Sequence, residues 1–224
     1  GFFDGVHRGH RHLIEQVRTT AAQRSLSSAV ITFPVHPRKV MQSAFQPQLL
    51  TSAIEKQQLL AATGIDAVWM MPFTPELSAL SARSFMQVLR DEYRVAALVI
   101  GYDHRFGHNR TEGFDDYVRY GRELGMEVLP ATVYPDCVVS SSDVRHLLGK
   151  GDVQAASCLL GYDYFVEGIV VGGHRVGREI GYPTANIQPL EADKLIPADG
   201  VYVVRVAIGE ETYGGMLSIG RRPT

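Results

Sequence analysis

Two histidines stand three residues apart near the amino end of the chain, in the segment GVHRGH at residues 5–10. Residues at this spacing lie on one face of a helix. The backbone N–H groups of a helix start attract phosphate together with the helix dipole, and Gly9 leaves room for a ligand beside them. Imidazoles of His7 and His10 that donate to phosphate oxygens would stabilise charge on a departing pyrophosphate. The pattern indicates phosphate-transfer chemistry that needs no covalent intermediate.

The same histidine pair has two other interpretations. A pair at this spacing is also found as a capping or surface feature. A metal site would need further ligands, and no nearby Asp, Glu or Cys completes a ligand set. The loop FDG at residues 3–5, on the strand side of the pair, favours nucleotide chemistry over both.

A second candidate for phosphate binding is the segment VSSSDVR at residues 139–145. Hydroxyl and backbone N–H groups at a helix start hold phosphate oxygens, so Ser141 and Ser142 are candidate ligands. Arg145, one turn into the helix, would supply a forked cation. Taken alone, such a serine run is also typical of a simple helix N-cap. Its value for phosphate binding depends on its pairing with the histidine motif.

Alternating strands and helices must position these groups. Short apolar runs bounded by turn residues predict buried strands at Ala29–Phe33, Ala67–Met71, Ala96–Ile100, Glu127–Pro130 and Val138–Val139. Helical patterns lie between them at Arg11–Arg24, Ser52–Thr63, Ala82–Tyr93 and Gly113–Leu124, with Gly64 and Gly125 at C-cap positions. This alternation predicts an α/β fold with a Rossmann-like, doubly wound parallel sheet.

The pattern changes after about Leu160. The residue types predict strands at Tyr164–Val171, Val201–Ala207 and Gly215–Ile219 and a turn at Glu210–Tyr213. Glycines are frequent in the segments between them. Strands separated by Gly-rich turns predict an all-β module. We expect short connecting helices at Ser142–Leu148 and Val153–Leu160. We therefore expect domains at 1–150 and 162–224, joined by a linker helix at 151–161.

Composition narrows the class of protein. Lys and Arg number 22 and Asp and Glu 24, so the net charge of −2 offers no general platform for nucleic acid or a membrane surface. Cys137 and Cys158 form neither a disulfide framework nor a CxxC metal pattern, which fits the cytoplasm. No apolar run approaches the ~18 residues of a membrane span. The sequence indicates no oligomeric state. Residues 1–5 read as a loop leaving a strand, so we expect the natural domain to begin before Gly1.

The segment FDGVHRGH at residues 3–10 resembles the HxGH signature of the nucleotidyltransferase superfamily, in the form used by bacterial bifunctional riboflavin kinase/FAD synthetases. That family usually has Asn before the Phe, whereas this chain has Phe2. The resemblance implies transfer of AMP from ATP to FMN, which gives FAD and pyrophosphate. It also implies that Mg²⁺ is held mainly by ATP. The implied ATP site contains Phe3, Gly5, Gly9, Ser141 and Ser142, with His7, His10 and Arg145 as the catalytic groups.

Two loops extend the resemblance to the flavin. The segment GYDHRFG at residues 101–107 follows a predicted strand and resembles the flavin-side wall of the family, which makes Asp103 and Phe106 candidate isoalloxazine contacts. From its residues alone it is a polar loop with one anchoring aromatic. The segment TFPVHP at residues 32–37 is similar to a family loop that normally reads FxPHP, with Pro34 one place early; His36 has a purely structural interpretation as well.

The segment GREIGYPTAN at residues 177–186 is very like the riboflavin kinase signature. Glycines such as Gly177 let backbone amides approach phosphates, and Thr184 and Asn186 offer oxygen ligands suited to Mg²⁺ and ATP. The resemblance implies a partial, riboflavin kinase-like β-barrel at 162–224. In the family the carboxylate that acts as base lies farther downstream. We therefore expect residues 1–224 not to phosphorylate riboflavin, although the full-length protein should.

Two rival functions stay open at this point. The superfamily also transfers nucleotidyl groups to other phosphorylated acceptors, and only the kinase-like half and the loop around Asp103 favour FMN. A flavin- or nucleotide-binding protein without catalysis is the other rival, although it would not need leaving-group stabilisers such as the two histidines.

Overall fold

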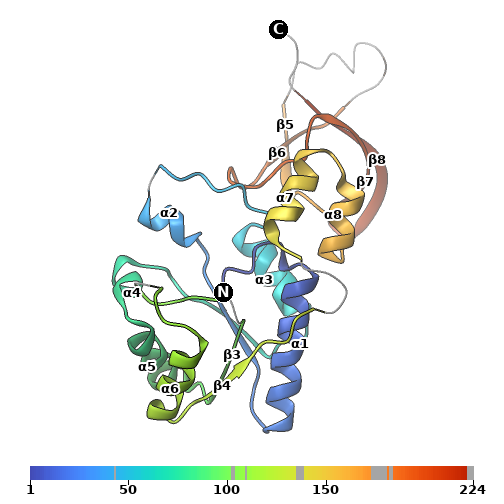
Figure 1. Cartoon of the computed structure of the whole chain (residues 1–224). Helices are drawn as coiled ribbons and strands as arrows, with labels where there is room; N and C mark the ends of the chain where they lie inside the picture. Colours follow the sequence, from blue (N-terminus) through green and yellow to red (C-terminus); the bar gives the residue numbers. More distant parts are fainter. Residues whose placement is uncertain are drawn as a thin grey trace. The chain divides into compact units, whose positions relative to one another are not determined.

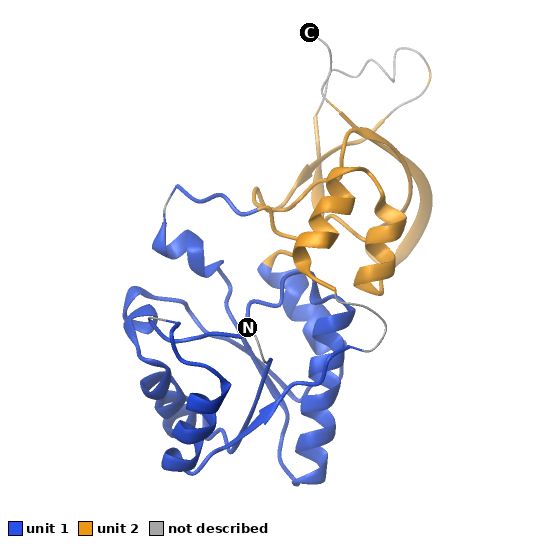
Figure 2. Cartoon of the chain, viewed as in Figure 1, with its two compact units in different colours: residues 1–47, 53–138 blue, residues 48–52, 139–224 orange. Residues whose placement is uncertain are grey.

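The computed structural model describes residues 1–42, 44–101, 104–108, 110–134, 139–172, 181 and 184–220. These residues divide into two compact units, which Figure 2 shows in separate colours. Unit 1 comprises residues 1–47 and 53–138, and unit 2 comprises residues 48–52 and 139–224. The predictions made for Asp103, Cys137 and Gly177 lie outside the described residues, as does half of the predicted strand Val138–Val139.

Unit 1 alternates strands with helices (Figure 1). In chain order its elements are η1 (Asp4–Val6), α1 (Arg8–Gln23), β1 (Ala29–Thr32), α2 (Pro37–Met41), α3 (Ala53–Ala61), β2 (Ala67–Met70), α4 (Pro75–Ala79), α5 (Ala82–Tyr93), β3 (Ala97–Ile100), α6 (Phe114–Leu124) and β4 (Glu127–Pro130). The four predicted helices and the first four predicted strands are confirmed to within a few residues. The short helices α2 and α4 were not predicted; each begins at a proline, which suits the first helical position.

The strands of unit 1 pair in parallel. Strand β1 pairs with β2, with Ala29 opposite Ala67, and β3 pairs with β4, with Ala97 opposite Glu127. Parallel neighbours need a crossover connection, which α3 and α6 supply. The described part of unit 1 is thus a mixed α/β structure with two parallel strand pairs.

Two hydrophobic clusters lie on opposite faces of the strands. Val30 of β1 belongs to a cluster with Ile14 of α1 and Leu60 of α3, whereas its neighbour Ile31 packs against a cluster built from α5 and α6. Successive side chains of a strand point to opposite faces, so β1 separates the two clusters. Figure 1 shows α1 on one side of the strands and α5 with α6 on the other.

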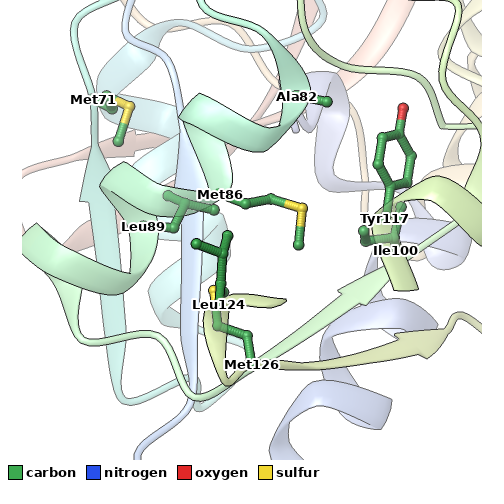
Figure 3. Packing of buried hydrophobic residues seen from close by; sticks show 8 residues of the cluster. All are labelled: Met71, Ala82, Met86, Leu89, Ile100, Tyr117, Leu124 and Met126. Carbon is green, nitrogen blue, oxygen red and sulfur yellow. The ribbon is translucent and has the colours of Figure 1, made fainter. Parts of the chain in front are cut away.

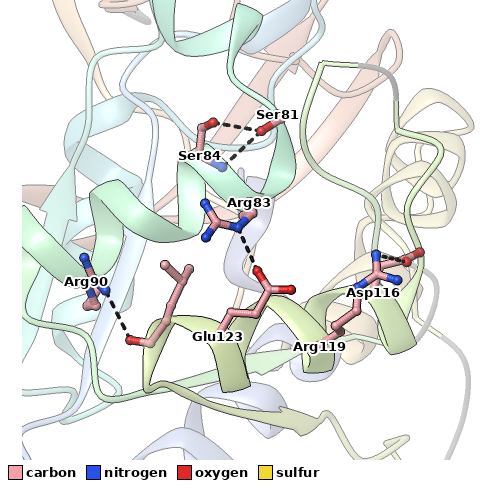
Figure 4. Close-up of polar contacts among 8 residues, drawn as sticks. Ser81, Arg83, Ser84, Arg90, Asp116, Arg119 and Glu123 are labelled. Carbon is pink, nitrogen blue, oxygen red and sulfur yellow. Dashed lines mark hydrogen bonds and ion pairs between the residues drawn. The ribbon is translucent and has the colours of Figure 1, made fainter.

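The α5–α6 cluster is drawn in Figure 3. Ala82, Met86 and Leu89 of α5 recur at helical spacing and are almost fully buried. Gly121 allows α6 to lie close to β4, because a Cβ there would stand 2.7 Å from Cγ2 of Val128. On the outer surface Arg83 pairs with Glu123 at 2.9 Å, as Figure 4 shows. Both side chains of that pair are nearly half exposed, so it adds little stability.

Unit 2 contains two helices followed by antiparallel strands. Its elements are α7 (Ser141–Gly149), α8 (Val153–Leu160), β5 (Gly168–Val171), β6 (Asn186–Pro189), β7 (Gly200–Ile208) and β8 (Glu211–Ile219). In the described part of this unit β5 pairs with β6 and β7 with β8. The predicted turn at Glu210–Tyr213 is wrong in its position: β8 already begins at Glu211, because the chain reverses at Gly209, whose φ is 60°.

The core of unit 2 gathers α7, α8 and the segment at residues 48–52. Leu50 packs with Val144, Leu148, Ala156 and Leu160. Lys194 holds this segment through its ammonium group, which donates to the Leu50 carbonyl at 2.8 Å. Among the helices of the described ranges, none combines the length and the apolar composition that a membrane span requires.

Candidate active site

The turn before α1 has an unusual backbone. Phe3 and Gly5 have φ values of 54° and 76°, and Val6 has a φ of 37°. Gly5 adopts this conformation without strain, whereas a positive φ is strained for a β-branched residue. Val6 is fully buried, and its carbonyl accepts a hydrogen bond from Nε of Arg11 at 3.1 Å. Packing and this bond hold a strained turn immediately before the histidine pair, which is typical of functional sites.

His7 is the N-cap of α1. Its Nδ1 accepts a hydrogen bond from the backbone N–H of His10 at 3.3 Å. Because Nδ1 is the acceptor, the proton of the neutral imidazole lies on Nε2. The cap therefore turns His7 into a hydrogen-bond donor at Nε2, and the capping interpretation of the pair and its phosphate-binding interpretation are compatible.

His10 stacks on His7, with ring centroids 3.6 Å apart and an angle of 18° between the rings. The Phe3 ring meets His10 edge-on at 5.1 Å. Burial lowers the pKa of His10 well below its ordinary value, and positive charge on His7 and Lys56 acts in the same direction. Its Nδ1 is buried and has no hydrogen-bond partner among the described residues. A buried nitrogen of this kind calls for a water or a ligand atom.

Hydrogen bonds place the histidine turn at the carboxyl ends of strands. Thr32, the last residue of β1, donates through its hydroxyl to the Phe2 carbonyl at 3.0 Å. Gln16 of α1 donates to the Pro130 carbonyl at the end of β4 at 2.8 Å, and it accepts from the Thr132 N–H at 2.7 Å. Ligands of open parallel sheets bind at this edge. These hydrogen bonds place the turn and α1 beside the ends of β1 and β4 within unit 1.

The loop after β1 has its own structure around His36. Its Nδ1 accepts from the Arg38 N–H at 3.1 Å and so caps α2, while its ring meets Phe2 edge-on at 4.7 Å. These contacts support a structural role for His36.

Phe106 lies in the loop after β3. Its ring stacks on Tyr117 of α6 with centroids 4.2 Å apart, and its N–H donates to the Tyr117 hydroxyl at 3.1 Å. Phe85 of α5 meets the same ring edge-on at 5.6 Å. These contacts anchor the loop to the α5–α6 cluster. A role of Phe106 as a flavin contact stays a prediction.

The second phosphate motif lies in unit 2. Ser140 caps α7: its hydroxyl accepts from the Asp143 N–H at 3.2 Å, and Asp143 accepts from the Ser140 N–H in return. Ser141 and Ser142 occupy the first two helical positions, where backbone N–H groups lack intrahelical partners. Arg145 donates through Nε to the Gln48 carbonyl at 2.8 Å. The convergence of Arg145 with the histidines on one triphosphate stays a prediction.

Two of the three predicted site residues of the kinase motif, Thr184 and Asn186, lie among the described residues. Thr184 is exposed, and Asn186 is exposed as the first residue of β6, opposite Val171. Binding of Mg²⁺ by their side-chain oxygens stays a prediction. Within the described ranges no group of three or more His, Cys, Asp or Glu residues could hold a metal ion.

The burial of Lys56 was not predicted from its sequence. A lysine in the first turn of a helix normally lies in solvent, yet Lys56 of α3 is only 1% exposed. No local pattern distinguishes it from an exposed lysine, because its burial depends on contacts with residues 2–4 and 33.

Comparison with known proteins agrees with these features. Residues 1–143 match the family model described as FAD synthetase, and residues 160–224 match the model described as Riboflavin kinase. Proteins named bifunctional riboflavin kinase/FMN adenylyltransferase are similar to the chain: that of Listeria monocytogenes is 38% identical over 98% of this chain and 70% of its own length. That of Escherichia coli K12 is 36% identical over 100% and 72%.

A solved structure shares the fold. A crystal structure titled Macrolide-efflux Protein from Streptococcus pneumoniae has a TM-score of 0.88 and 30% identity, and the match covers 100% of this chain and 73% of that chain. The family models together match most of the chain, and they match the regions that hold the histidine pair and the GREIGYPTAN segment. The chain belongs to the family of bifunctional riboflavin kinase/FMN adenylyltransferases.

Proposed function

We propose that this chain transfers the adenylyl group of ATP to FMN and so forms FAD and pyrophosphate. The observation that carries the proposal is the stacked pair of His7 and His10 at the start of α1, where the cap orients Nε2 of His7 as a donor. The family to which the chain belongs is named for this activity.

The reaction is a displacement at phosphorus. A phosphate oxygen of FMN forms a bond to the α-phosphorus of ATP, and the bond from that phosphorus to the oxygen bridging the β-phosphate breaks. The electron pair leaves with pyrophosphate. A phosphomonoester loses its second proton near pH ~6, so the attacking oxygen is already ionised at neutral pH and no general base is required. The protein has to position both substrates and stabilise the departing charge.

His7 and His10 are the proposed donors to the departing phosphate oxygens. The Nε2–H of His7 donates to a phosphate oxygen, and its orientation is set before substrate binds, which avoids reorganisation during the reaction. The lowered pKa of His10 keeps its ring neutral at pH 7 in the free protein. A bound triphosphate favours the protonated ring, so the pair gains positive character when the anion is present.

We propose in addition that Arg145, Ser141 and Ser142 hold the β- and γ-phosphates at the start of α7. The two parallel strand pairs of unit 1 would belong to one doubly wound sheet, since the two clusters lie on opposite faces of the strands. Asp103 and Phe106 are the proposed contacts of the isoalloxazine ring.

The residues of unit 1 fit a cation held by the nucleotide better than a cation held by the protein. No cluster of three metal-ligating side chains occurs in the parts of the chain that the structure describes. Mg²⁺ bound by ATP would neutralise charge on the phosphates, in keeping with its preference for phosphate oxygens and water.

The second activity proposed for the full-length protein is phosphorylation of riboflavin with ATP. Its region would be 162–224, behind a linker helix at 151–161 and a transferase domain at 1–150. Thr184 and Asn186 would supply oxygen ligands to Mg²⁺, and Gly177 would supply backbone amides to the phosphates.

One incubation tests the proposed transferase. Protein, FMN, ATP and Mg²⁺ are combined and FAD is measured by chromatography, with pantetheine phosphate and nicotinate mononucleotide as parallel acceptors. FAD as the preferred product supports the proposal. Turnover of another acceptor in its place would assign the chain to a different reaction, and folded protein without turnover would make it a binding protein.

A further inference from the structure

Lys56 is one of the largest side chains that the fold buries completely. It lies in the first turn of α3 and is 1% exposed. Lysine is almost never fully buried unless its charge is paired, because removing an ammonium group from water is costly. A buried lysine beside a candidate active site therefore needs an account of what it does there.

The ammonium group of Lys56 joins three segments of unit 1. It donates to the Phe33 carbonyl, just after β1, at 2.7 Å. It lies 3.7 Å from the centroid of the Phe2 ring, which is a close cation–π contact. It is also attracted by Asp4, which is 3% exposed and is the first residue of η1. Lys56 thus connects α3, the end of β1 and the turn that leads into the histidine pair.

The charges that face Lys56 come from several elements. Asp4 favours the ammonium form, whereas the lowered pKa of His10 leaves its ring neutral over the pH range in which Lys56 titrates, so that imidazole adds no opposing charge. Glu55, the neighbouring residue on α3, is buried as well. Burial outweighs the attraction of Asp4 and lowers the pKa of Lys56 from 10.5 to about 8. The charge on this lysine therefore changes within a pH range in which the substrates' phosphates are already ionised.

We propose that Lys56 is a positioning residue for adenylyl transfer: its ammonium group fixes the turn at residues 2–6 against the end of β1 and so maintains the stacked geometry of His7 and His10. The inference depends on the proposed function, because it assigns a role within that reaction. Lys56 acts through the turn rather than on the nucleotide, since its Nζ is already engaged by a carbonyl and a ring and is shielded from solvent.

The test compares Lys56→Met, Lys56→Arg and the unchanged chain in FAD formation between pH 6.5 and 10. For the unchanged chain we expect kcat/KM for ATP to fall as pH rises through about 8 and to level off. Lys56→Met should show that lower level at every pH, about 10- to 100-fold below the neutral-pH value, the loss typical of a displaced catalytic group. Lys56→Arg, whose side chain stays charged, should lack the fall near pH 8. Lys56→Gln replaces Lys56→Met if the latter does not fold.

Lys194 provides the matched control. It is 7% exposed, donates to the Leu50 carbonyl and lies 4.6 Å from the centroid of the Tyr164 ring, so it is a chemically similar lysine in unit 2. Lys194→Met should keep the fall near pH 8, because Lys56 is intact.

The outcomes separate the two proposals. Lys56→Met with unchanged kcat/KM, or Lys56→Arg with the same fall near pH 8 as the unchanged chain, would overturn the role of Lys56. Absence of FAD formation by the unchanged, folded chain would instead overturn the proposed function.

Discussion

The burial of Lys56 has a measurable consequence for stability. Its pKa is about 8 in the folded chain, and in the unfolded chain it returns to its ordinary value of 10.5. Below pH 8 both states carry the proton, and above pH 10.5 neither does. Between these values the unfolded state binds more protons, so the free energy of unfolding rises with pH. At ~1.36 kcal/mol per pKa unit, the rise attributable to Lys56 is roughly 3 kcal/mol.

The change that isolates this contribution is Lys56→Met. Unfolding in urea is followed for both chains at pH values from 7 to 10.5, and the difference between their free energies of unfolding is plotted against pH. Other groups that titrate in this range are present in both chains and cancel in the difference. Trp69 is the single tryptophan and lies in β2, so its fluorescence reports on unit 1 alone. This matters because a chain of two units need not unfold in one step.

We expect the stability of the unchanged chain relative to Lys56→Met to increase between pH 8 and 10.5 and to be constant below pH 8. Lys194→Met, measured in the same way, should track the unchanged chain in the Trp69 signal. A difference that does not vary with pH would show that the Lys56 ammonium group is not desolvated, and it would contradict the positioning role of Lys56.

Three further predictions concern other parts of the chain. His10→Ala should lower kcat for FAD formation about 100-fold, the size of losing one charge-stabilising donor, and an unchanged kcat with intact thermal stability would remove His10 from the mechanism. Gly121→Ala should destabilise unit 1 by ~1–3 kcal/mol in urea unfolding followed by Trp69, because the new Cβ would stand 2.7 Å from Cγ2 of Val128 and 2.8 Å from the Met126 carbonyl oxygen; unchanged stability would contradict this close packing. Ser140→Ala should cost ~1 kcal/mol of helix stability by removing the cap of α7, which lower thermal stability by circular dichroism would reveal; no change would mean that Asp143 caps the helix alone.

Local patterns were sufficient to predict most of the elements. Helix α5 spans Ala82–Tyr93 and β4 spans Glu127–Pro130, as their periodicity and flanking residues predict. Gly125 ends α6 with a φ of 70°, as its place in the sequence predicts. These features depend on side chains within one turn or one strand, so the neighbouring residues contain the information.

Residue types and spacing also predicted the chemistry of the histidine pair. Two imidazoles at a helix start, with hydroxyls and an arginine far along the chain, are candidates for a phosphate site, and that role stays a prediction. The tautomer of His7 was not readable, because it depends on the bond between its Nδ1 and the His10 N–H.

Features that depend on distant segments required the fold. The predicted turn at Glu210–Tyr213 was wrong because pairing with β7 extends β8 back to Glu211. The positive φ of Val6 is held by packing against residues of α1 and α3 and by Arg11. Lys56 is buried because Phe2, Asp4 and Phe33 meet around one ammonium group. The sequence alone thus predicted which groups are candidates for phosphate transfer. Only tertiary packing decided the lowered pKa values of His10 and Lys56, because the burial that causes them is created by residues far apart in the chain.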